Sequence, residues 1–558
     1  MENMSKRLPS RNYVNLIPQG LFLLSILLSV VTTYYVTGHY IDSDASSELV
    51  LAKHLAETGQ ILSQDWYYST ELRVLNTQLV YAPLFLIFED WHMVRFVGAL
   101  ILQGIMILSY YFLLHEAGVS KRVFFLSAAL LLLPVSVAYG RIVLYHCFYI
   151  PHIALSFFLV GLTLGFAQKI SWRSWKPWLR LFLLLLFSFI GGLGGIRQLM
   201  ITHAPLVLCI FTICFLEDLH SPDQQSSIFL SPNRRFLIAT SLFSTLFSFI
   251  GGKVNSDILS KYYSFQNQSN KTLNLLEAEQ IDDILYGFLH QFGYREHISM
   301  LSAIGILSLA GLFVAGYCIY VSIHNLKHAD KSNNICTSVL RIFFFFYAII
   351  MIVVFVLITD PKDPYLHPLY LTFCISWASP MLILHLEDVP KQMHFLNVKK
   401  LFPLFAAIIL VVNGFANVAY FGGCKTFEQP YEGLSFKEPD KVNSMLSVAS
   451  YLQENQYGIG HATFWNANVL TEMTDGDVRM IHVSFDADSG NIWYRNWLTS
   501  QYLREEDNSK PFVLMQQSQK EAFESSDSFR FCSIAYEDEN YCVYDITNLS
   551  EFNPLLYS

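Results

Sequence analysis

The sequence predicts a mainly α-helical fold, in which a polytopic transmembrane bundle of about eleven spans precedes a small C-terminal α/β domain. Three observations lead to this fold class. The chain of 558 residues is 53% hydrophobic and only 15% charged, whereas soluble domains carry about a quarter charged residues. Apolar runs of about 20 residues recur along it, and each is long enough to cross about 30 Å of hydrocarbon. After Gly422 the chain becomes polar and contains short strand-like runs.

Eleven apolar segments make up the predicted bundle. The glycine cluster Gly191–Gly195 interrupts one long apolar stretch, and we expect a helix break there because glycine permits both a break and a close backbone approach. The segment Thr77–Phe88 is apolar but too short to span, so we expect it to be re-entrant or interfacial. The predicted spans are 14–36, 93–115, 122–139, 145–167, 179–196, 199–216, 236–252, 299–323, 341–359, 366–386 and 401–421.

The distribution of Lys and Arg sets the expected orientation. The N-terminal segment carries Lys6, Arg7 and Arg11, and alternate short loops are rich in basic residues, whereas the loops between them mostly carry one. The positive-inside rule therefore predicts a cytoplasmic N-terminus in a multi-pass plasma-membrane protein. The first outer loop, residues 37–77, then lies outside the cytoplasm, together with residues 253–298 and the C-terminal domain. An odd number of spans agrees with this topology.

The C-terminal part is predicted to be an extracytoplasmic α/β domain because strand-like and helical stretches alternate in it. Cys532 and Cys542 flank a predicted hairpin, where a cross-strand disulfide and two unpaired thiols are both compatible with the sequence. No CxxC spacing occurs, so a zinc site is not supported. The predicted division of the chain is 1–421 for the transmembrane domain and 422–558 for the α/β domain.

The first outer loop carries two acids, Asp42 and Asp44, directly after the first span. Carboxylates at a membrane surface are costly unless they face water, a cation or a substrate, so both are candidate catalytic residues. Ser43 or Asp44 is expected to cap a helix that begins near Ala45. Capping would explain an acid at position 44 without a catalytic role, but it would not explain Asp42. The functional interpretation is a catalytic base, or a pair that shares a divalent cation such as Mg²⁺ or Mn²⁺.

The helix after these acids is predicted to be amphipathic and to lie on the membrane surface. Its apolar face is formed at helical spacing by Leu49, Ala52, Leu55 and Ala56. Its water-facing residues are expected to be Glu48, Lys53 and Glu57.

The order of these features resembles the GT-C glycosyltransferases, in the bacterial branch related to protein mannosyltransferases. The shared features are a cytosolic N-terminus, one span, an acidic motif immediately outside it, an amphipathic surface helix and many further spans. The run Asp42–Leu84 has the layout of the family's first loop, in which the first acid is the catalytic base and a second acidic stretch precedes a Pro-Leu pair. Asp65 and Glu71 occupy that second stretch here. The resemblance covers residues 14–421 as architecture and implies a polyprenyl-phosphate-linked sugar donor.

Other polar residues at the predicted outer helix ends are candidate substrate contacts. Arg197 ends the glycine-rich break, where it could bind a lipid phosphate bidentately; the alternative is a snorkelling arginine between packed helices. Arg141 and His146 stand at another outer junction, and His146 is either a catalyst or a hydrogen-bonded packing residue.

The outer loop Asp360–Leu369 departs from the pattern of the resembling family. Relatives often have an Arg-Tyr pair there, an apparent contact to the lipid phosphate, whereas this chain has Pro364-Tyr365. Lys362 or His367 could replace the missing arginine. Equally, the Asp-Pro pairs could make a turn.

Taken together, these features predict an inverting membrane glycosyltransferase that transfers a sugar from a polyprenyl-phosphate donor to a glycan, lipid or protein acceptor of the cell envelope, at the outer face of the bilayer. Asp42 would deprotonate the acceptor, with Asp44 assisting or holding a metal, while the phosphate leaves near Arg197. Two alternatives stay open: a lipid-glycan transporter or flippase, and a non-catalytic envelope assembly protein. Nucleic acid is not an expected partner, because no basic stripe stands in a polar domain.

Overall fold

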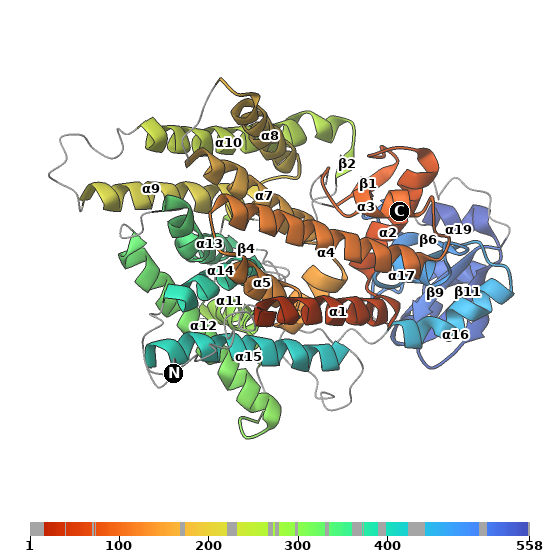
Figure 1. The fold of residues 1–558 in the computed structure, drawn as a ribbon. Helices are drawn as coiled ribbons and strands as arrows, with labels where there is room; N and C mark the ends of the chain where they lie inside the picture. Colours follow the sequence, from red (N-terminus) through yellow and green to blue (C-terminus); the bar gives the residue numbers. More distant parts are fainter. Residues whose placement is uncertain are drawn as a thin grey trace, which may run out of the picture.

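Long apolar helices form a bundle, and the C-terminal sheet domain lies at one end of it (Figure 1). The computed structural model describes residues 16–39, 41–69, 72, 74–167, 173–219, 232–265, 272–273, 278–295, 299–329, 334–359, 371, 373–388, 398–421, 441–501 and 510–555. The longer helices of the bundle are α1 Leu16–His39, α4 Trp91–Glu116, α7 Ile150–Leu164, α8 Trp175–Leu193, α9 Ala204–Leu219, α10 Pro232–Asp257, α12 Ala303–Lys327, α13 Ile335–Leu357 and α15 Val398–Phe421. The shorter ones are α2 Ser43–Thr58, α3 Gln78–Leu84, α5 Lys121–Leu131, α6 Val137–Tyr139, α11 Ala278–His290 and α14 Phe373–Asp388.

Eight helices of the described chain are long and apolar enough to cross a membrane. The predicted span 122–139 is wrong as a single helix. Its first part, α5, ends at Leu131, ahead of Pro134, which has no backbone N–H to continue the helix. The predicted spans 366–386 and 401–421 correspond to α14 and α15, and α14 has only 16 residues. The predicted fold class, a membrane-spanning helical bundle with a small sheet domain, is confirmed.

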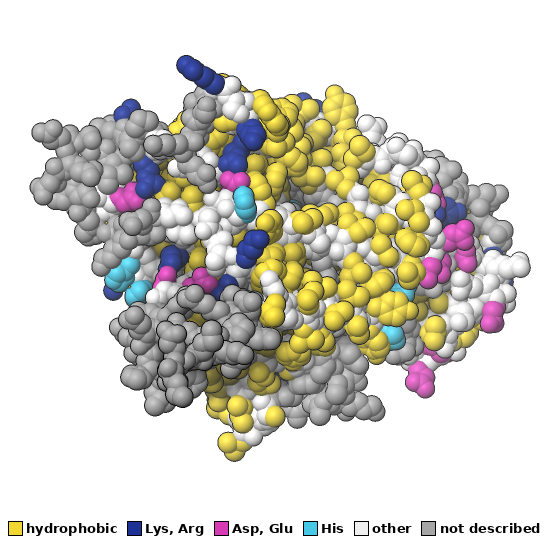
Figure 2. Space-filling model, in the orientation of Figure 1, with side chains coloured by type: hydrophobic (Ala, Val, Ile, Leu, Met, Phe, Trp, Pro, Cys, Tyr) yellow, Lys and Arg dark blue, Asp and Glu magenta, His cyan; other side chains and the backbone are white. Residues whose placement is uncertain are grey.

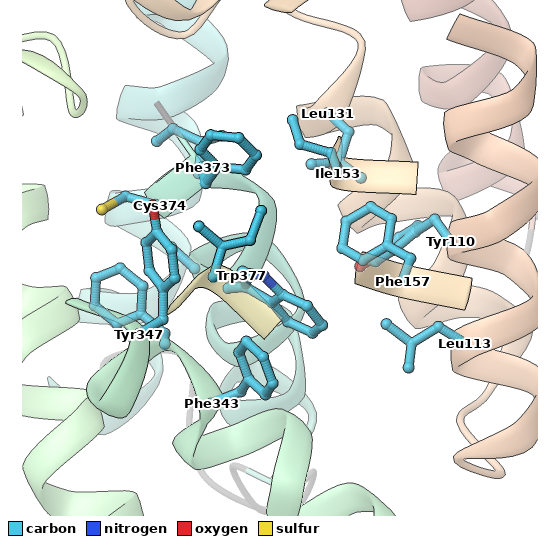
Figure 3. Packing of buried hydrophobic residues seen from close by; sticks show 14 of the residues in the cluster. Tyr110, Leu113, Leu131, Ile153, Phe157, Phe343, Tyr347, Phe373, Cys374 and Trp377 are labelled. Carbon is cyan, nitrogen blue, oxygen red and sulfur yellow. The ribbon is translucent and has the colours of Figure 1, made fainter. Parts of the chain in front are cut away.

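Buried aromatic rings join four helices in the middle of the bundle (Figure 3). The rings of Phe343 on α13 and Trp377 on α14 stack with centroids 3.7 Å apart. The ring of Phe157 on α7 packs edge-to-face with Trp377, with centroids 5.2 Å apart, and lies tilted against Tyr110 on α4, with centroids 4.9 Å apart. Aromatic pairs of this kind contribute about 0.5–1.5 kcal/mol each beyond the burial of their area. The chain of rings therefore fixes α4 and α7 against α13 and α14.

The predicted glycine break is confirmed, and its glycines also let two helices approach closely. Helix α8 ends at Leu193, and Gly195 follows with φ of +86°, a left-handed conformation that glycine adopts without strain. A Cβ on Gly192 would collide with the backbone of Ser248 on α10. A Cβ on Gly251 of α10 would likewise collide with the backbone of Phe189 on α8. The small residues thus set the spacing between α8 and α10.

Hydrophobic side chains cover the middle of the molecule, and charged ones gather at its two ends (Figure 2). Many large apolar residues are exposed on the helices, for example Leu27 at 64% and Leu108 at 69%. Such a surface is costly in water and matched by lipid. A cleft at the end far from the sheet domain is lined by Glu116, Ala167, Arg234 and Ile335, from the end of α4, the 3-10 turn that follows α7 and the beginnings of α10 and α13. Helix ends that border alternate loops of the predicted topology therefore lie together at one end of the bundle.

Six strands form the sheet of the C-terminal domain, in the order β10-β11-β9-β5-β6-β7. Strand β5 pairs in parallel with β6 and β9, and the other neighbours pair antiparallel. Helices α16 and α17 pack on one face, and α18 and α19 lie on the other, so the predicted α/β character is confirmed. The elements are α16 Lys441–Glu454, β5 Ile459–Thr463, α17 Phe464–Met473, β6 Arg479–Phe485, β7 Ile492–Tyr494, β9 Phe512–Gln516, α18 Lys520–Glu524, β10 Cys532–Glu537, β11 Tyr541–Ile546 and α19 Leu549–Leu555.

The two cysteines of the predicted hairpin are free thiols. Cys532 pairs in register with Ile546, whereas Cys542 lies opposite Glu537, so the two are not cross-strand partners. Of the two alternatives that the sequence left open, the structure has the unpaired thiols. The predicted domain boundary at 421/422 borders residues 422–440, which lie outside the described residues.

A second, three-stranded sheet joins three segments that are far apart in the chain. Strand β1, Trp66–Tyr68 of the first outer loop, pairs in parallel with β2, Ser264–Phe265, and antiparallel with β8, Thr499–Ser500 of the C-terminal domain. All three segments were predicted to lie on the same side of the membrane. Their pairing agrees with that shared side.

Candidate functional site

Asp42 caps the helix that follows the first span. Helix α2 begins at Ser43, and the Oδ1 atom of Asp42 accepts a hydrogen bond of 2.8 Å from the backbone N–H of Ala45. A short acidic side chain at this position satisfies a free backbone donor and complements the helix dipole. The expectation that Ser43 or Asp44 is the cap is therefore wrong. The helix begins two residues earlier than predicted, so the capping role falls to Asp42.

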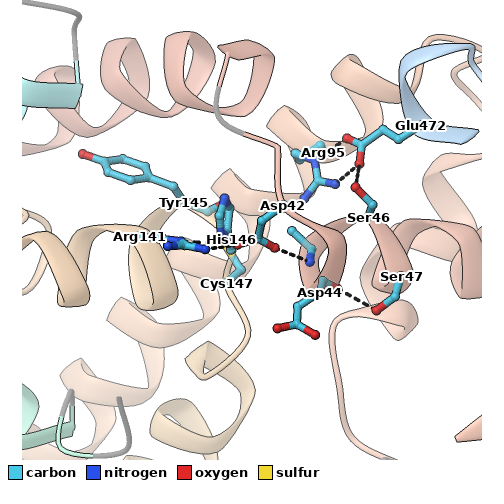
Figure 4. A network of polar contacts seen from close by, with 11 residues as sticks. Asp42, Asp44, Ser46, Ser47, Arg95, Arg141, Tyr145, His146, Cys147 and Glu472 are labelled. Atoms are coloured by element: carbon cyan, nitrogen blue, oxygen red, sulfur yellow. Dashed lines mark hydrogen bonds and ion pairs between the residues drawn. The ribbon is translucent and has the colours of Figure 1, made fainter. Parts of the chain in front are cut away.

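The second oxygen of Asp42 faces two basic side chains (Figure 4). Its Oδ2 atom accepts hydrogen bonds from Nη2 of Arg141 at 2.9 Å and from Nε at 3.3 Å. Nδ1 of His146 lies 3.0 Å from the same oxygen. Burial alone would raise the pKa of Asp42, but the charges of His146 and Arg141, with the Ala45 N–H, hold it well below its usual range. Asp42 is a buried carboxylate kept ionised by its neighbours.

The break that ended the predicted span 122–139 brings Arg141 and His146 to this place. Ser136 caps α6 by accepting the N–H of Tyr139, and a π-helix, Gly140–Tyr145, carries Arg141. Cys147, next to His146, has φ of +61° although it is not glycine and is buried. Left-handed non-glycine residues are strained and concentrate at functional sites. Arg141 and His146 were predicted together at an outer helix junction apart from Asp42, and the structure brings both to Asp42.

Asp44 is exposed and points away from Asp42 (Figure 4). Its backbone carbonyl accepts the hydroxyl of Ser47. Burial lowers the pKa of Arg495 in the C-terminal domain, and the negative charge of Asp44 opposes this, which places the two side chains near each other. The two acids are thus turned toward different cations of the protein. Among the described residues, no group of three or more His, Cys, Asp and Glu is arranged to hold a metal ion.

Helix α2 is enclosed by protein, which differs from the predicted surface helix. Leu49 and Ala52 are fully buried, and Glu48, which was expected to face water, is only 6% exposed. The carboxylate of Glu48 accepts hydrogen bonds from Asn76 and Thr77, so its burial is compensated. The apolar face of α2 was predicted to lie on the membrane. The sequence alone does not reveal that α3 and α17 pack against this helix.

Arg197 lies on the chain between the break after α8 and the π-helix Leu199–His203. Its Nη1 atom is 3.1 Å from Nε2 of His152, and its guanidinium lies over the ring of Tyr149 at 5.4 Å. Tyr149 and His152 stand at the start of α7, only a few residues after His146. The short segment 141–152 therefore carries contacts to both Asp42 and Arg197.

The remaining predicted site residues do not join this cluster. Asp65 is exposed in the turn before β1, and its charge acts on His54, about three turns of α2 away from Asp42. Its backbone carbonyl accepts the N–H of Gln501 from the C-terminal domain. Three further candidates lie outside the described residues: Glu71, Lys362 and His367.

A buried ion pair beside the site was not predicted from the sequence. Arg95 of α4 and Glu472 of α17 are joined, with side chains only 1% and 3% exposed. The available signal was an arginine inside the predicted apolar span 93–115, because a charge within a span is expected to have a partner. Its partner is 377 residues further along the chain, and no local pattern connects the two.

The whole chain resembles three solved structures in its overall course. The apo oligosaccharyltransferase of Archaeoglobus fulgidus matches with a TM-score of 0.48 and 10% identity, over 96% of this chain and 75% of that one. ArnT from Cupriavidus metallidurans in its apo state matches with a TM-score of 0.48 and 11% identity, over 94% of this chain and 98% of that one. The same ArnT bound to undecaprenyl phosphate matches with a TM-score of 0.45 and 11% identity, over 95% of this chain and 99% of that one. No protein-family model and no curated relative matches the sequence.

Proposed function

We propose that this protein is a membrane glycosyltransferase that uses a polyprenyl-phosphate-linked sugar and modifies a hydroxyl of an envelope glycan, lipid or protein. Its N-terminus would be cytoplasmic, and the site would lie on the outer face. The observation that carries the proposal is the buried, ionised Asp42 at the end of the apolar bundle, paired with Arg141 and His146.

Asp42 would act as the proton acceptor in a single, inverting displacement. A carboxylate with a strongly lowered pKa is a weak base, since a good general base has a pKa near the working pH. A donor phosphate near Arg141 would compete with Asp42 for the guanidinium and so raise the pKa of Asp42 when substrate is bound. Asp44 is exposed in the first turn of α2, directly after Ser43, and would assist on the acceptor side.

Arg197 would bind the phosphate of the lipid donor. Its guanidinium is held by His152 and Tyr149 at the end of the membrane helices, where a polyprenyl chain in the bilayer can present its phosphate. A planar guanidinium pairs bidentately with phosphate oxygens and stabilises the negative charge that develops as the sugar leaves. Arg141, which lies between Asp42 and Arg197 in the chain and beside His146, would add a second positive charge to the site.

The transporter alternative predicts charged residues in the middle of spans. Within the eight described apolar helices, Lys, Arg, Asp and Glu stand close to the helix ends, as with Arg95 in Trp91–Glu116 and Arg341 in Ile335–Leu357. This distribution favours a site at the membrane surface over a pathway through it.

The test is an envelope glycan and glycolipid profile of a strain lacking the gene, complemented with wild-type protein or with Asp42→Asn. Asn still caps a helix, so the variant is expected to fold, insert and lose the transfer product. Asp90→Asn is the matched control, because Asp90 caps α4 by accepting the N–H of Met93 and is exposed. A full product level with Asp42→Asn would refute the assignment.

A further inference from the structure

One buried carboxylate connects the C-terminal domain with the membrane bundle. Oε1 of Glu472 accepts a hydrogen bond of 2.6 Å from Nε of Arg95, and its Oε2 pairs with Nη2 of the same guanidinium. Arg95 belongs to the second turn of α4, and Glu472 to the last turn of α17. The geometry is the two-pronged arrangement that guanidinium and carboxylate groups favour.

The same carboxylate also holds the beginning of the helix that carries Asp42 (Figure 4). The hydroxyl of Ser46 donates to Oε2 of Glu472 at 2.7 Å. Ser46 lies in the first turn of α2, and its backbone N–H donates to the carbonyl of Asp42 at 2.9 Å. Glu472 is therefore linked to Asp42 through one side chain and one backbone hydrogen bond.

Two further contacts attach the ends of α17 to the same neighbours. Near its first residue, the carbonyl of Trp465 accepts the hydroxyl of Ser43 at 2.6 Å. Beyond its last residue, Oδ1 of Asp475 accepts the backbone N–H of Trp91, the first residue of α4, at 2.9 Å. Helix α17 is thus attached to the start of α2 at one end and to the start of α4 at the other.

Stability alone does not account for this arrangement. Replacing a buried ion pair by apolar residues of similar size is often neutral or stabilising, because desolvation offsets much of the attraction. An apolar pair, however, cannot accept the hydroxyl of Ser46. The specific consequence of Glu472 is a fixed position for the first turn of α2.

We propose that Glu472, Arg95 and Ser46 are positioning residues, through which the C-terminal domain holds Asp42 in register with Arg141 and His146. The catalytic part of this inference rests on the proposed function. The sheet domain would then be a structural component of the site and not an appendage, since its last α17 turn determines where the carboxylate of Asp42 lies.

The decisive variant is Ser46→Ala, which removes one hydroxyl and leaves the buried ion pair intact. The matched control is Ser47→Ala, because the hydroxyl of Ser47 is equally buried on the same turn but donates to the backbone of Asp44. In the complemented strain, Ser46→Ala is expected to lower product formation at least tenfold, while Ser47→Ala keeps it. The double variant Arg95→Met/Glu472→Met should remain folded, with a similar unfolding midpoint, and show the same loss.

A second measurement does not depend on the reaction. The interaction between Asp42 and Arg141 can be measured on purified full-length protein from the unfolding midpoints of Asp42→Asn, Arg141→Met and the double variant. We expect this coupling to fall by half or more in the Ser46→Ala background and to be unchanged with Ser47→Ala. An unchanged coupling with Ser46→Ala would overturn the inference. If Asp42→Asn itself left product formation intact, the proposed function would fail, and the coupling would still decide whether Ser46 positions Asp42.

Discussion

Replacing Arg141 by Met removes one of the two basic side chains that hold the pKa of Asp42 low. At the observed separation of 2.9 Å and an effective dielectric constant of about 20, two unit charges attract by roughly 6 kcal/mol, which is an upper bound. The side chain of Arg141 is 22% exposed, so solvent reduces this value, and a neighbouring guanidinium typically lowers a carboxyl pKa by about one to three pH units. Arg141→Met should therefore lower the free energy of unfolding by about 1.4–4 kcal/mol at neutral pH.

The sign of its pH dependence follows from linkage. The pKa of Asp42 is lower in the folded protein than its usual value of 3.8. The stability that this provides is present above the unfolded pKa and is lost as the pH falls through the folded pKa. In Arg141→Met the folded pKa rises, so the difference from wild type should be full above the folded pKa of the variant and shrink as the pH falls from there toward the lower folded pKa of wild type.

The assay is the thermal unfolding midpoint in detergent between about pH 3 and pH 8, a range that covers the titration of carboxyl groups. Many other carboxylates titrate there, so the comparison is repeated in the Asp42→Asn background, where the pH-dependent part of the Arg141→Met effect should vanish. A difference that does not vary with pH, or that persists unchanged in Asp42→Asn, would refute the assignment of this charge pair.

Three further outcomes are expected. Gly192→Ala should lower the free energy of unfolding, measured by denaturant titration, by about 1–3 kcal/mol, because the added Cβ would meet the backbone of Ser248. Gly316→Ala is the control: nothing lies within 4 Å of its added Cβ, so it should be neutral or slightly stabilising in the same titration. Undecaprenyl phosphate should raise the unfolding midpoint of wild type but not of Arg197→Met, with undecaprenol as the uncharged control. Cys532 should react slowly with alkylating reagents until the protein is unfolded, because burial raises its pKa to about 12 and the thiolate is the reactive form.

Much of the fold could be predicted because hydrophobic length and local composition determine it. The long apolar runs became helices, the cluster Gly191–Gly195 became a break, and the tail became an α/β sheet with helices on both faces. The failures were local. Pro134 and Ser136 divide the apolar stretch 122–139, because the missing N–H and the cap at Ser136 favour a break that the hydropathy of the stretch conceals.

The site could be predicted only in part, because its contacts are between distant segments. The sequence indicated Asp42, Arg141 and Arg197 individually, as charges at the ends of apolar helices. The pairing of Asp42 with Arg141 depends on the π-helix Gly140–Tyr145, and the contact of Arg197 with His152 joins two different helices; neither leaves a periodic signal. The partner of Arg95 could not be predicted for the same reason, because Glu472 lies 377 residues further along the chain.

The error about the first outer loop was to give the helix cap to Ser43 or Asp44 and to deny it to Asp42. The cap and the proposed base fall on the same residue, because the two oxygens of Asp42 have separate partners: Oδ1 accepts the N–H of Ala45, and Oδ2 faces Arg141 and His146. Ser, Thr or Asn would cap the helix about equally well, so capping alone does not require an aspartate here. The negative charge is needed only toward the two basic residues. Asp42→Asn is therefore the informative substitution, since Asn keeps the helix cap and removes the negative charge that the proposed reaction would use.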